Sequence, residues 1–280
     1  MTANAHVASH RSGIAARTGL GWLFGAPAVV ALAFFAVPII ALVWRAASSG
    51  ELADNITSEL VLDSLRISAI TSTVTLVVAI LVGTPLAYLL ARKQFRGKIF
   101  VDMLIDLPIV LPPTVAGVAL LVTLGRRGVI GDSLDASGIE VAFTTTAVVL
   151  AQLFVSAPFY IRTVKAGFEG VEPVYEGVAS TLGASPLRTF WRVTLPLAWP
   201  SIVAGAILCW ARALSELGAT LIFAGNLQGR TQTMPLAIIS AFESGRSIDV
   251  PIALSVILVA AAAVLLLLLR ILARTAPARM

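Results

Sequence analysis

Residues 175–205, YEGVASTLGASPLRTFWRVTLPLAWPSIVAG, separate two long apolar runs in a chain that is 58% apolar. Glu172-Pro173, just before this stretch, favours a helix start, because proline at the first helical position gives up no hydrogen bond. Gly183 can end that helix, since glycine takes a left-handed turn at little cost. Ser185-Pro186 then restarts a helix as its cap and first residue. The pattern predicts two short helices joined by a glycine bend, the second ending at Leu195-Pro196.

Both predicted helices carry apolar residues at helical spacing on one face. These residues are Tyr175, Val178 and Leu182 in the first helix, and Leu187, Phe190 and Trp191 in the second. One interpretation is a pair of helices resting on lipid. A segment that only rests on lipid does not need a sharp bend at a fixed place, whereas a segment that docks in a groove of another protein does. The bend therefore favours docking against another protein.

The rest of the chain is dominated by apolar runs. Its mean hydropathy is +0.93 and charged residues make up 12%, about half the fraction expected of a soluble protein. A membrane-spanning helix needs about 20 apolar residues, and backbone groups in lipid must be satisfied internally. Six runs meet that requirement, namely 22–44, 67–91, 107–125, 141–161, 193–223 and 250–269. The sequence predicts an all-α integral membrane protein with six transmembrane helices.

The basic residues indicate the orientation of these spans. Thirteen lysines and arginines would lie on the side of both termini and of the 162–195 segment, against six on the other side. Because cytoplasmic loops are enriched in lysine and arginine, we expect both termini in the cytoplasm and no nucleic-acid partner, despite a net charge of +5. We expect cytoplasmic tails at 1–20 and 275–280 around one permease domain, 21–274, with 126–140 and 224–249 as external loops.

Three prolines at the start of the third run, Pro108, Pro112 and Pro113, predict a bent or broken helix. A break of this kind is tolerated in a membrane where the freed carbonyls meet protein or water. It is either a simple kink or a part of a transport pathway. A further short helix is expected within the 224–249 loop, around Pro235–Phe242.

Several classes of function lack the residues that they need. The sequence has no phosphate-binding loop of the G-x-x-x-x-G-K-[ST] type and no hydrolase or metalloprotease motif. Its single cysteine, Cys209, offers neither a disulfide framework nor a thiol metal site, and both histidines lie in the N-terminal tail. We expect no cofactor and no enzymatic activity. A secondary transporter driven by ions is an alternative with thin support, and an intramembrane enzyme is less favoured still.

The stretch EGVASTLGASPLRTFWRVTLP resembles the EAA loop in permease subunits of ATP-binding-cassette importers. The pattern falls on Glu176, Gly177, Val178, Gly183, Ser185, Pro186, Leu195 and Pro196, with Gly177 and Val178 in place of the usual alanine pair. The resemblance implies a coupling loop, residues 172–194, that inserts in a cleft of a separate ATPase subunit. It also implies that two copies of the chain form the pathway, in a bacterial or archaeal cell membrane.

Further stretches, LPIVLPPTVAGVALL and ARALSELGATLIFAGNLQGRTQTMPLAI, resemble permeases for tetrahedral oxyanions. The resemblance covers roughly residues 60–270 and is nearest to molybdate permeases, with tungstate as a co-substrate and sulfate or thiosulfate as alternatives. It implies a periplasmic or lipid-anchored binding protein that delivers the oxyanion, against 126–140 and 224–249.

One pair of charges lies inside a predicted span. Arg212 and Glu216 are four residues apart and thus on one helix face, and charge inside a membrane is a functional candidate by default. The two charges either form a structural ion pair that stabilises the helix bundle, or lie beside the transport pathway or its gate. Because a permease must also release its ion, neutral donors suit the pathway, and Thr114, Ser215 and Thr220 are the candidates.

Overall fold

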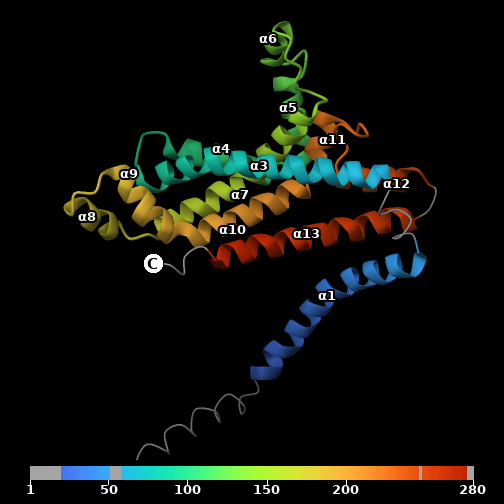
Figure 1. Ribbon diagram of the computed structural model, residues 1–280, viewed down its shortest axis with the longest axis horizontal. Coiled ribbons are helices and arrows are strands. Elements are labelled where there is room, and N and C mark those ends of the chain that lie inside the picture. Colours follow the sequence, from blue (N-terminus) through green and yellow to red (C-terminus); the bar gives the residue numbers. More distant parts are fainter. Residues whose placement is uncertain (1–19, 51–57, 246–247, 276–280) are drawn as a thin grey trace, which may run out of the picture. The chain divides into compact units, whose positions relative to one another are not determined.

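The computed structural model describes residues 20–50, 58–245 and 248–275, and every regular element in them is helical (Figure 1). Helix α1, Leu20–Ser49, belongs to one compact unit, and the remaining helices form a second unit. The predicted tails, 1–20 and 275–280, lie almost entirely outside the described residues. The all-helical prediction is confirmed for the described part of the chain.

Four helices in the described residues are long and apolar enough to cross a membrane. They are Phe24–Ser49 within α1, α3 (Glu59–Arg92), α7 (Thr145–Glu169) and the continuous stretch Pro186–Leu214. A bent pair, α4 (Lys98–Val110) and α5 (Pro113–Leu124), makes a fifth if it is counted as one span. The predicted span 250–269 falls on α13, Asp249–Thr275, whose apolar part Asp249–Val264 is shorter.

Helices α3 and α7 run side by side in the same direction (Figure 1). Thr75 Oγ1 donates to the Val149 carbonyl at 3.3 Å, and Thr84 Oγ1 lies 2.6 Å from Tyr160 Oη. Gly83 makes this approach possible, since a Cβ there would lie 2.9 Å from the Tyr160 ring. Hydrogen bonds and small residues of this kind hold helices together where lipid removes the hydrophobic drive for association.

Helix α10 (Leu195–Leu214) packs antiparallel to α7 in the same core. Gly205 lies against the Tyr160 carbonyl, and Gly167 lies directly against the Ser201 side chain. Buried aromatic rings, including Tyr160, Phe168 and Trp210, fill the space between the three helices. These helices form the closely packed centre of the second unit.

The third predicted run is broken, as its prolines predicted. Helix α4 ends at Val110, α5 begins at Pro113, and the two axes differ by 118°. Leu111 is extended because the residue before a proline avoids the helical conformation. Helix α5 then packs on α11 (Gly218–Ala224), with α6 (Gly131–Ala136) beyond it.

The fifth predicted run, 193–223, is not one helix, which corrects the sequence interpretation. Helix α10 stops at Leu214, and α11 begins only at Gly218. Nor does Leu195-Pro196 end the preceding helix. Helix α9 (Pro186–Thr189) continues through a π-helical turn, Phe190–Thr194, into α10. Proline has no N–H to donate, and the wider turn accommodates it, with Leu195 N bonded to the Phe190 carbonyl.

The remaining elements follow the sequence closely. The short helix expected in the 224–249 loop is α12, Met234–Glu243. The short helix expected at Glu172-Pro173 is α8, Pro173–Thr181.

The α5–α11 contact gives a test of the packing. A Cβ on Gly117 would lie 2.9 Å from the backbone of Ala219. Gly117→Ala should therefore lower the free energy of unfolding by the ~1–3 kcal/mol typical of overpacking, and with it the melting temperature in detergent. Gly177→Ala is the matched control, because it also lies within a helix but has open space around its Cβ. Alanine there should be neutral or slightly stabilising. Equal melting temperatures for both variants would contradict this packing.

Candidate functional site

Helices α8 and α9 form as the local signals predicted. Glu172 is extended, and Pro173 opens α8. Gly183 has φ +81° and ends the first helical segment, with its N–H bonded to the Ser180 carbonyl. Ser185 Oγ accepts the Arg188 N–H at 3.4 Å, which caps α9. The bend between the two helices therefore depends on a backbone conformation that non-glycine residues rarely adopt.

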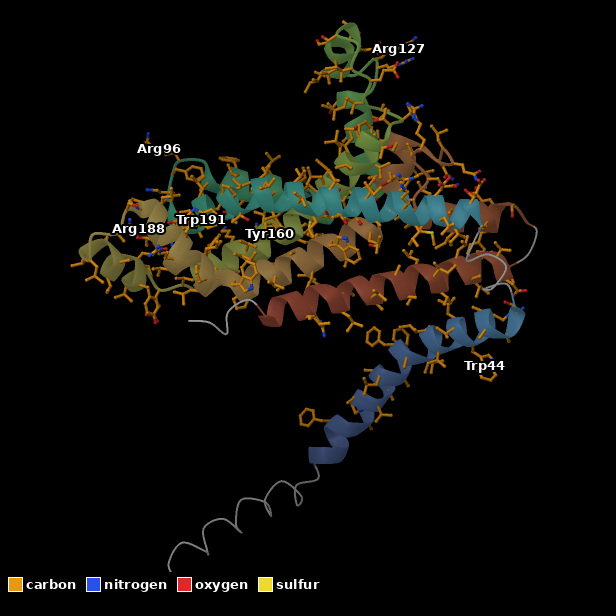
Figure 2. The ribbon with its side chains drawn as sticks, viewed as in Figure 1. Trp44, Arg96, Arg127, Tyr160, Arg188 and Trp191 are labelled. Carbon is orange, nitrogen blue, oxygen red and sulfur yellow. The ribbon has the colours of Figure 1, made fainter. Side chains whose placement is uncertain are left out.

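An apolar surface, which we call the α8–α9 surface, lies uncovered at this end of the bundle. No residue of α8 is buried, and Leu182 is 83% exposed. The members of the surface are Val174, Tyr175, Val178, Leu182, Leu187 and Trp191. Figure 2 places Trp191 and Arg188 at the end of the bundle that carries α8 and α9. Exposed apolar residues on two adjoining short helices make this surface a candidate for contact with another protein.

The carboxylate of Glu176 contacts groups of the chain itself. Its Oε1 accepts from Arg92 Nε at 3.1 Å and from Thr194 Oγ1 at 2.8 Å. Gly177 beside it is exposed with open space around it, and Leu195 and Pro196 are half-buried at the start of α10. Sequence reasoning missed Arg92, which lies 84 residues from Glu176 and outside the EAA-like stretch. It also missed Thr194, which lies within that stretch but 18 residues from Glu176 and at none of the positions that carry the resemblance.

Arg212 and Glu216 form an ion pair at the break between α10 and α11. Arg212 Nη2 lies 2.8 Å from Glu216 Oε2, and Glu216 is only 1% exposed. The other oxygen, Oε1, accepts the Ala219 N–H at 2.8 Å and so caps the first turn of α11. Ser215 is exposed, and its Oγ donates to the Arg212 carbonyl at 3.2 Å. The pair thus holds the two helices at a defined angle.

The break at 215–217 meets the break at 111–112. A Cβ on Gly218 would lie 3.0 Å from Pro113 Cβ and 3.3 Å from the Thr114 nitrogen. The structure therefore brings exposed Thr114 near the start of α11, which Glu216 caps. Thr220 differs from the other candidates, because its Oγ1 is buried on α11 and has no hydrogen-bond partner in the described residues.

The sequence analysis also missed a group of charges that joins α4 to α7. Arg162 hydrogen-bonds the Asp106 carboxylate, and Lys165 Nζ lies 2.7 Å from Asp102 Oδ1. Asp106 lies near the C-terminal end of α4. These partners lie 56 and 63 residues apart, a separation at which no local pattern links them.

A polar cavity of about 280 Å³ lies at the opposite end of α3 from Arg92. Its lining includes Asp63, Arg66 and Thr71 of α3, Thr145 of α7, and Arg230. Thr145 Oγ1 donates to the Arg230 carbonyl at 2.9 Å, which ties the loop that carries Arg230 to α7. Within the described part of the chain, neither arginine side chain has an ion-pair partner. We call this the arginine cavity.

The 126–140 segment is held by charges of its own. Arg126 hydrogen-bonds Glu140 and lies 3.7 Å from Asp135. The hydrogen bond that Arg126 donates to the Glu140 carboxylate is the main reason that the pKa of Arg126 is raised above its ordinary value. Figure 2 shows the neighbouring Arg127 on the projection that α5 and α6 form. Among the described residues, no cluster of histidine, cysteine or acidic side chains could hold a metal ion.

The structure makes the role of the Arg212–Glu216 pair testable. Glu216→Leu removes both the partner of Arg212 and the acceptor of the Ala219 N–H, so we expect a destabilisation of about 3 kcal/mol. Glu216→Gln retains an acceptor and should cost less, about 1–2 kcal/mol. Thermal unfolding in detergent, followed by tryptophan fluorescence, measures both. Unchanged melting of both variants, with substrate uptake lost, would assign the pair to the transport pathway instead.

Comparisons with known proteins identify the family of this chain. Residues 79–280 match the family described as the binding-protein-dependent transport system inner membrane component. The molybdenum transport system permease protein ModB of Mycobacterium bovis is 43% identical, over 85% of this chain and 89% of the relative. The molybdate/tungstate transport system permease protein WtpB of Pyrococcus abyssi is 44% identical, over 72% of this chain and 77% of the relative.

Among solved structures, one chain of a bacterial ABC transporter involved in the import of the acidic polysaccharide alginate has the same fold. Its TM-score is 0.73 at 17% identity, over 92% of this chain and 96% of that chain. At this identity the likeness concerns the fold alone. The match over residues 79–280 and the relatives at 43–44% identity lead to one conclusion. The chain belongs to the family of inner membrane components of binding-protein-dependent transport systems.

Proposed function

We propose that this chain is the permease subunit of an ATP-driven importer of molybdate, with tungstate as a co-substrate. The observation that carries the substrate is the 43–44% identity to relatives named molybdenum and molybdate/tungstate permeases. In this proposal the chain crosses the membrane six times, with both termini in the cytoplasm. Two copies form the pathway, and separate subunits hydrolyse ATP.

The α8–α9 surface supports docking of an ATPase subunit at residues 172–194. Its apolar side chains are exposed, and the bend between its two helices lies at the left-handed Gly183. An amphipathic helix that lays its apolar face into a groove is a common mode of recognition. Because α9 continues into α10, a shift of the docked helices would be passed directly to a membrane-spanning helix.

The meeting of the two helix breaks supports a pathway at that point. Broken helices in transporters line the substrate site, where their irregular backbone is not exposed to lipid. Arg212 would attract a dianion, and the adjacent Glu216 offsets most of that charge. The neutral hydroxyls of Thr114, Ser215 and Thr220 would then contact the oxyanion without retaining it, as passage through a pore requires.

The arginine cavity and the loops 126–140 and 224–249 would meet the binding protein. The cavity lies roughly 40 Å along α3 from Arg92, at a rise of 1.5 Å per residue. Its two arginines, without ion-pair partners in the described residues, suit a carboxylate on the binding protein, because guanidinium and carboxylate groups pair in a bidentate geometry.

Reconstituted transport tests the proposal. The chain is placed in proteoliposomes with its cassette ATPase and its binding protein, and uptake of molybdate is measured with tungstate and sulfate as competitors. We expect uptake that requires ATP, the ATPase and the binding protein. Tungstate should inhibit this uptake more strongly than sulfate does. Uptake that proceeds without the ATPase would instead establish an ion-driven transporter, and preferential uptake of sulfate would overturn the substrate.

Substitution of Gly183 separates docking from folding. Gly183→Pro cannot adopt φ +81°, because proline fixes φ near −65°. We expect at least about a tenfold loss of uptake, equivalent to about 1.4 kcal/mol of docking energy, while the protein still inserts in the membrane. The control is Gly50→Pro, at another glycine of positive φ that belongs to neither proposed docking segment. Normal uptake by Gly183→Pro would contradict docking at the bend.

The arginine cavity gives a second, independent measurement. Arg66→Gln and Arg230→Gln should each lower the apparent affinity for the binding protein about fivefold, the loss of roughly 1 kcal/mol that one ion pair can supply. The effect should fade at high salt, where charges on a surface are screened. Affinity that is unchanged in both variants at low salt would place the docking elsewhere.

A further inference from the structure

Two hydrogen bonds and a further ion-pair contact converge on one oxygen of Glu176. Arg92 Nε and Nη2 lie 3.1 and 3.0 Å from Oε1, and Thr194 Oγ1 lies 2.8 Å from the same atom. Arg92 Nη2 also donates to the Val171 carbonyl at 2.9 Å. We call this group the Glu176 node. The side chains of Arg92 and Glu176 are 13% and 21% exposed, and Thr194 is fully buried.

Helix α8 packs mainly on the π-helical turn and on α9, outside the core of the bundle. None of its residues is buried, and its apolar side chains lie on the uncovered α8–α9 surface. Apolar contacts are non-directional, whereas hydrogen bonds to an ionised carboxylate are short, directional and about twice as strong as neutral ones. The node therefore determines the direction in which α8 presents its apolar side chains.

The node also joins the elements that would have to move together. Arg92 is the last residue of α3, and Val171 precedes α8. Thr194 is the last residue of the π-helical turn that opens α10. About 30 Å further along α10, at 1.5 Å per residue, lies the Arg212–Glu216 pair at the second helix break. A shift of α8 at the node is thus applied to both α3 and α10.

We infer that Arg92 and Thr194 are positioning residues for energy coupling. They hold Glu176 so that α8 meets the ATPase subunit in one orientation, and they pass its movement to α3 and α10. The inference rests on the proposed function, because it assigns ATPase docking to the α8–α9 surface. A node with a purely structural role would instead stabilise the fold without affecting the orientation of α8.

The first experiment needs no partner protein. A spin label attached to a cysteine introduced by Val178→Cys reports the mobility of α8. The single native cysteine, Cys209, is buried and is first replaced by alanine, so that only the introduced cysteine is labelled. We expect Thr194→Val and Arg92→Gln to increase the mobility of the label, while Thr194→Ser, which keeps the hydroxyl, leaves it unchanged. Arg96→Gln is the charge-matched control, since this exposed arginine lies outside the node. A label equally ordered in all variants would overturn the inference.

The second experiment measures coupling in the full complex. Thr194→Val and Arg92→Gln should weaken ATPase binding about tenfold, as loss of a hydrogen bond to a charged group predicts, and should lower the uptake per ATP hydrolysed. Arg92→Lys keeps the charge but loses the fork and should be intermediate. The exchange of both charges, Arg92→Glu with Glu176→Arg, should recover part of the affinity.

Outcomes of the two experiments separate the inference from the proposed function. If the wild-type chain binds no ATPase while α8 loosens in the node variants, the positioning role stands without its partner, and the proposed function fails. If the wild-type chain binds ATPase and the node variants bind and transport equally well, the inference fails alone. Loss of affinity in Thr194→Ser as large as in Thr194→Val would also overturn it.

Discussion

Close contacts made by glycines hold the helices on which every other feature of the second unit depends. Gly83 admits the Tyr160 ring, Gly167 admits Ser201, and Gly205 lies against the Tyr160 carbonyl. A lipid solvent gives helices no hydrophobic reason to associate, so dispersion at short range and a few hydrogen bonds must hold them. The resulting core of α3, α7 and α10 carries a candidate site at each end. One end carries the Glu176 node, and the other carries the arginine cavity.

Irregular backbone occurs at two helix breaks beside this core. Prolines interrupt the chain at 111–113, and the chain leaves helical geometry again at 215–217. Each break exposes backbone groups that lipid could not satisfy. The two breaks lie against each other, and the Glu216 carboxylate accepts the Ala219 N–H. Both breaks are therefore built into the packing of α5 on α11.

Features set by neighbouring residues were predictable from the sequence. Gly183, Ser185 and the prolines before α5 act through local backbone conformation, and each lies where the pattern predicted. Features that join distant segments were not predictable. Arg92 meets Glu176 across 84 residues, and Arg162 meets Asp106 across 56.

Hydropathy failed in a different way at the fifth predicted span. Hydropathy sums transfer energies along the chain, so it predicted one continuous span over residues 193–223. The break at 215–217 is decided by a charged pair and a capping carboxylate, which such a sum does not contain. For the same reason it could not detect that α9 continues past Pro196. The candidate residues Arg212 and Glu216 were found because of their charge, but their capping geometry was not.

The π-helical turn at Phe190–Thr194 has a consequence for how the chain can vary. Each residue of an α-helix advances the next by about 100° around the axis, and a π turn contains one residue more than an α-helical turn. The turn therefore takes up one extra residue, while the residues on either side of it keep their faces approximately in register. Deleting one residue within the turn would restore an unbroken α-helix with α9 still facing in nearly the same direction. The same deletion in the regular helix of α10 would instead rotate α9 by about 100° relative to the rest of the bundle. A change in chain length is thus tolerated at the turn and not in the helix that follows it.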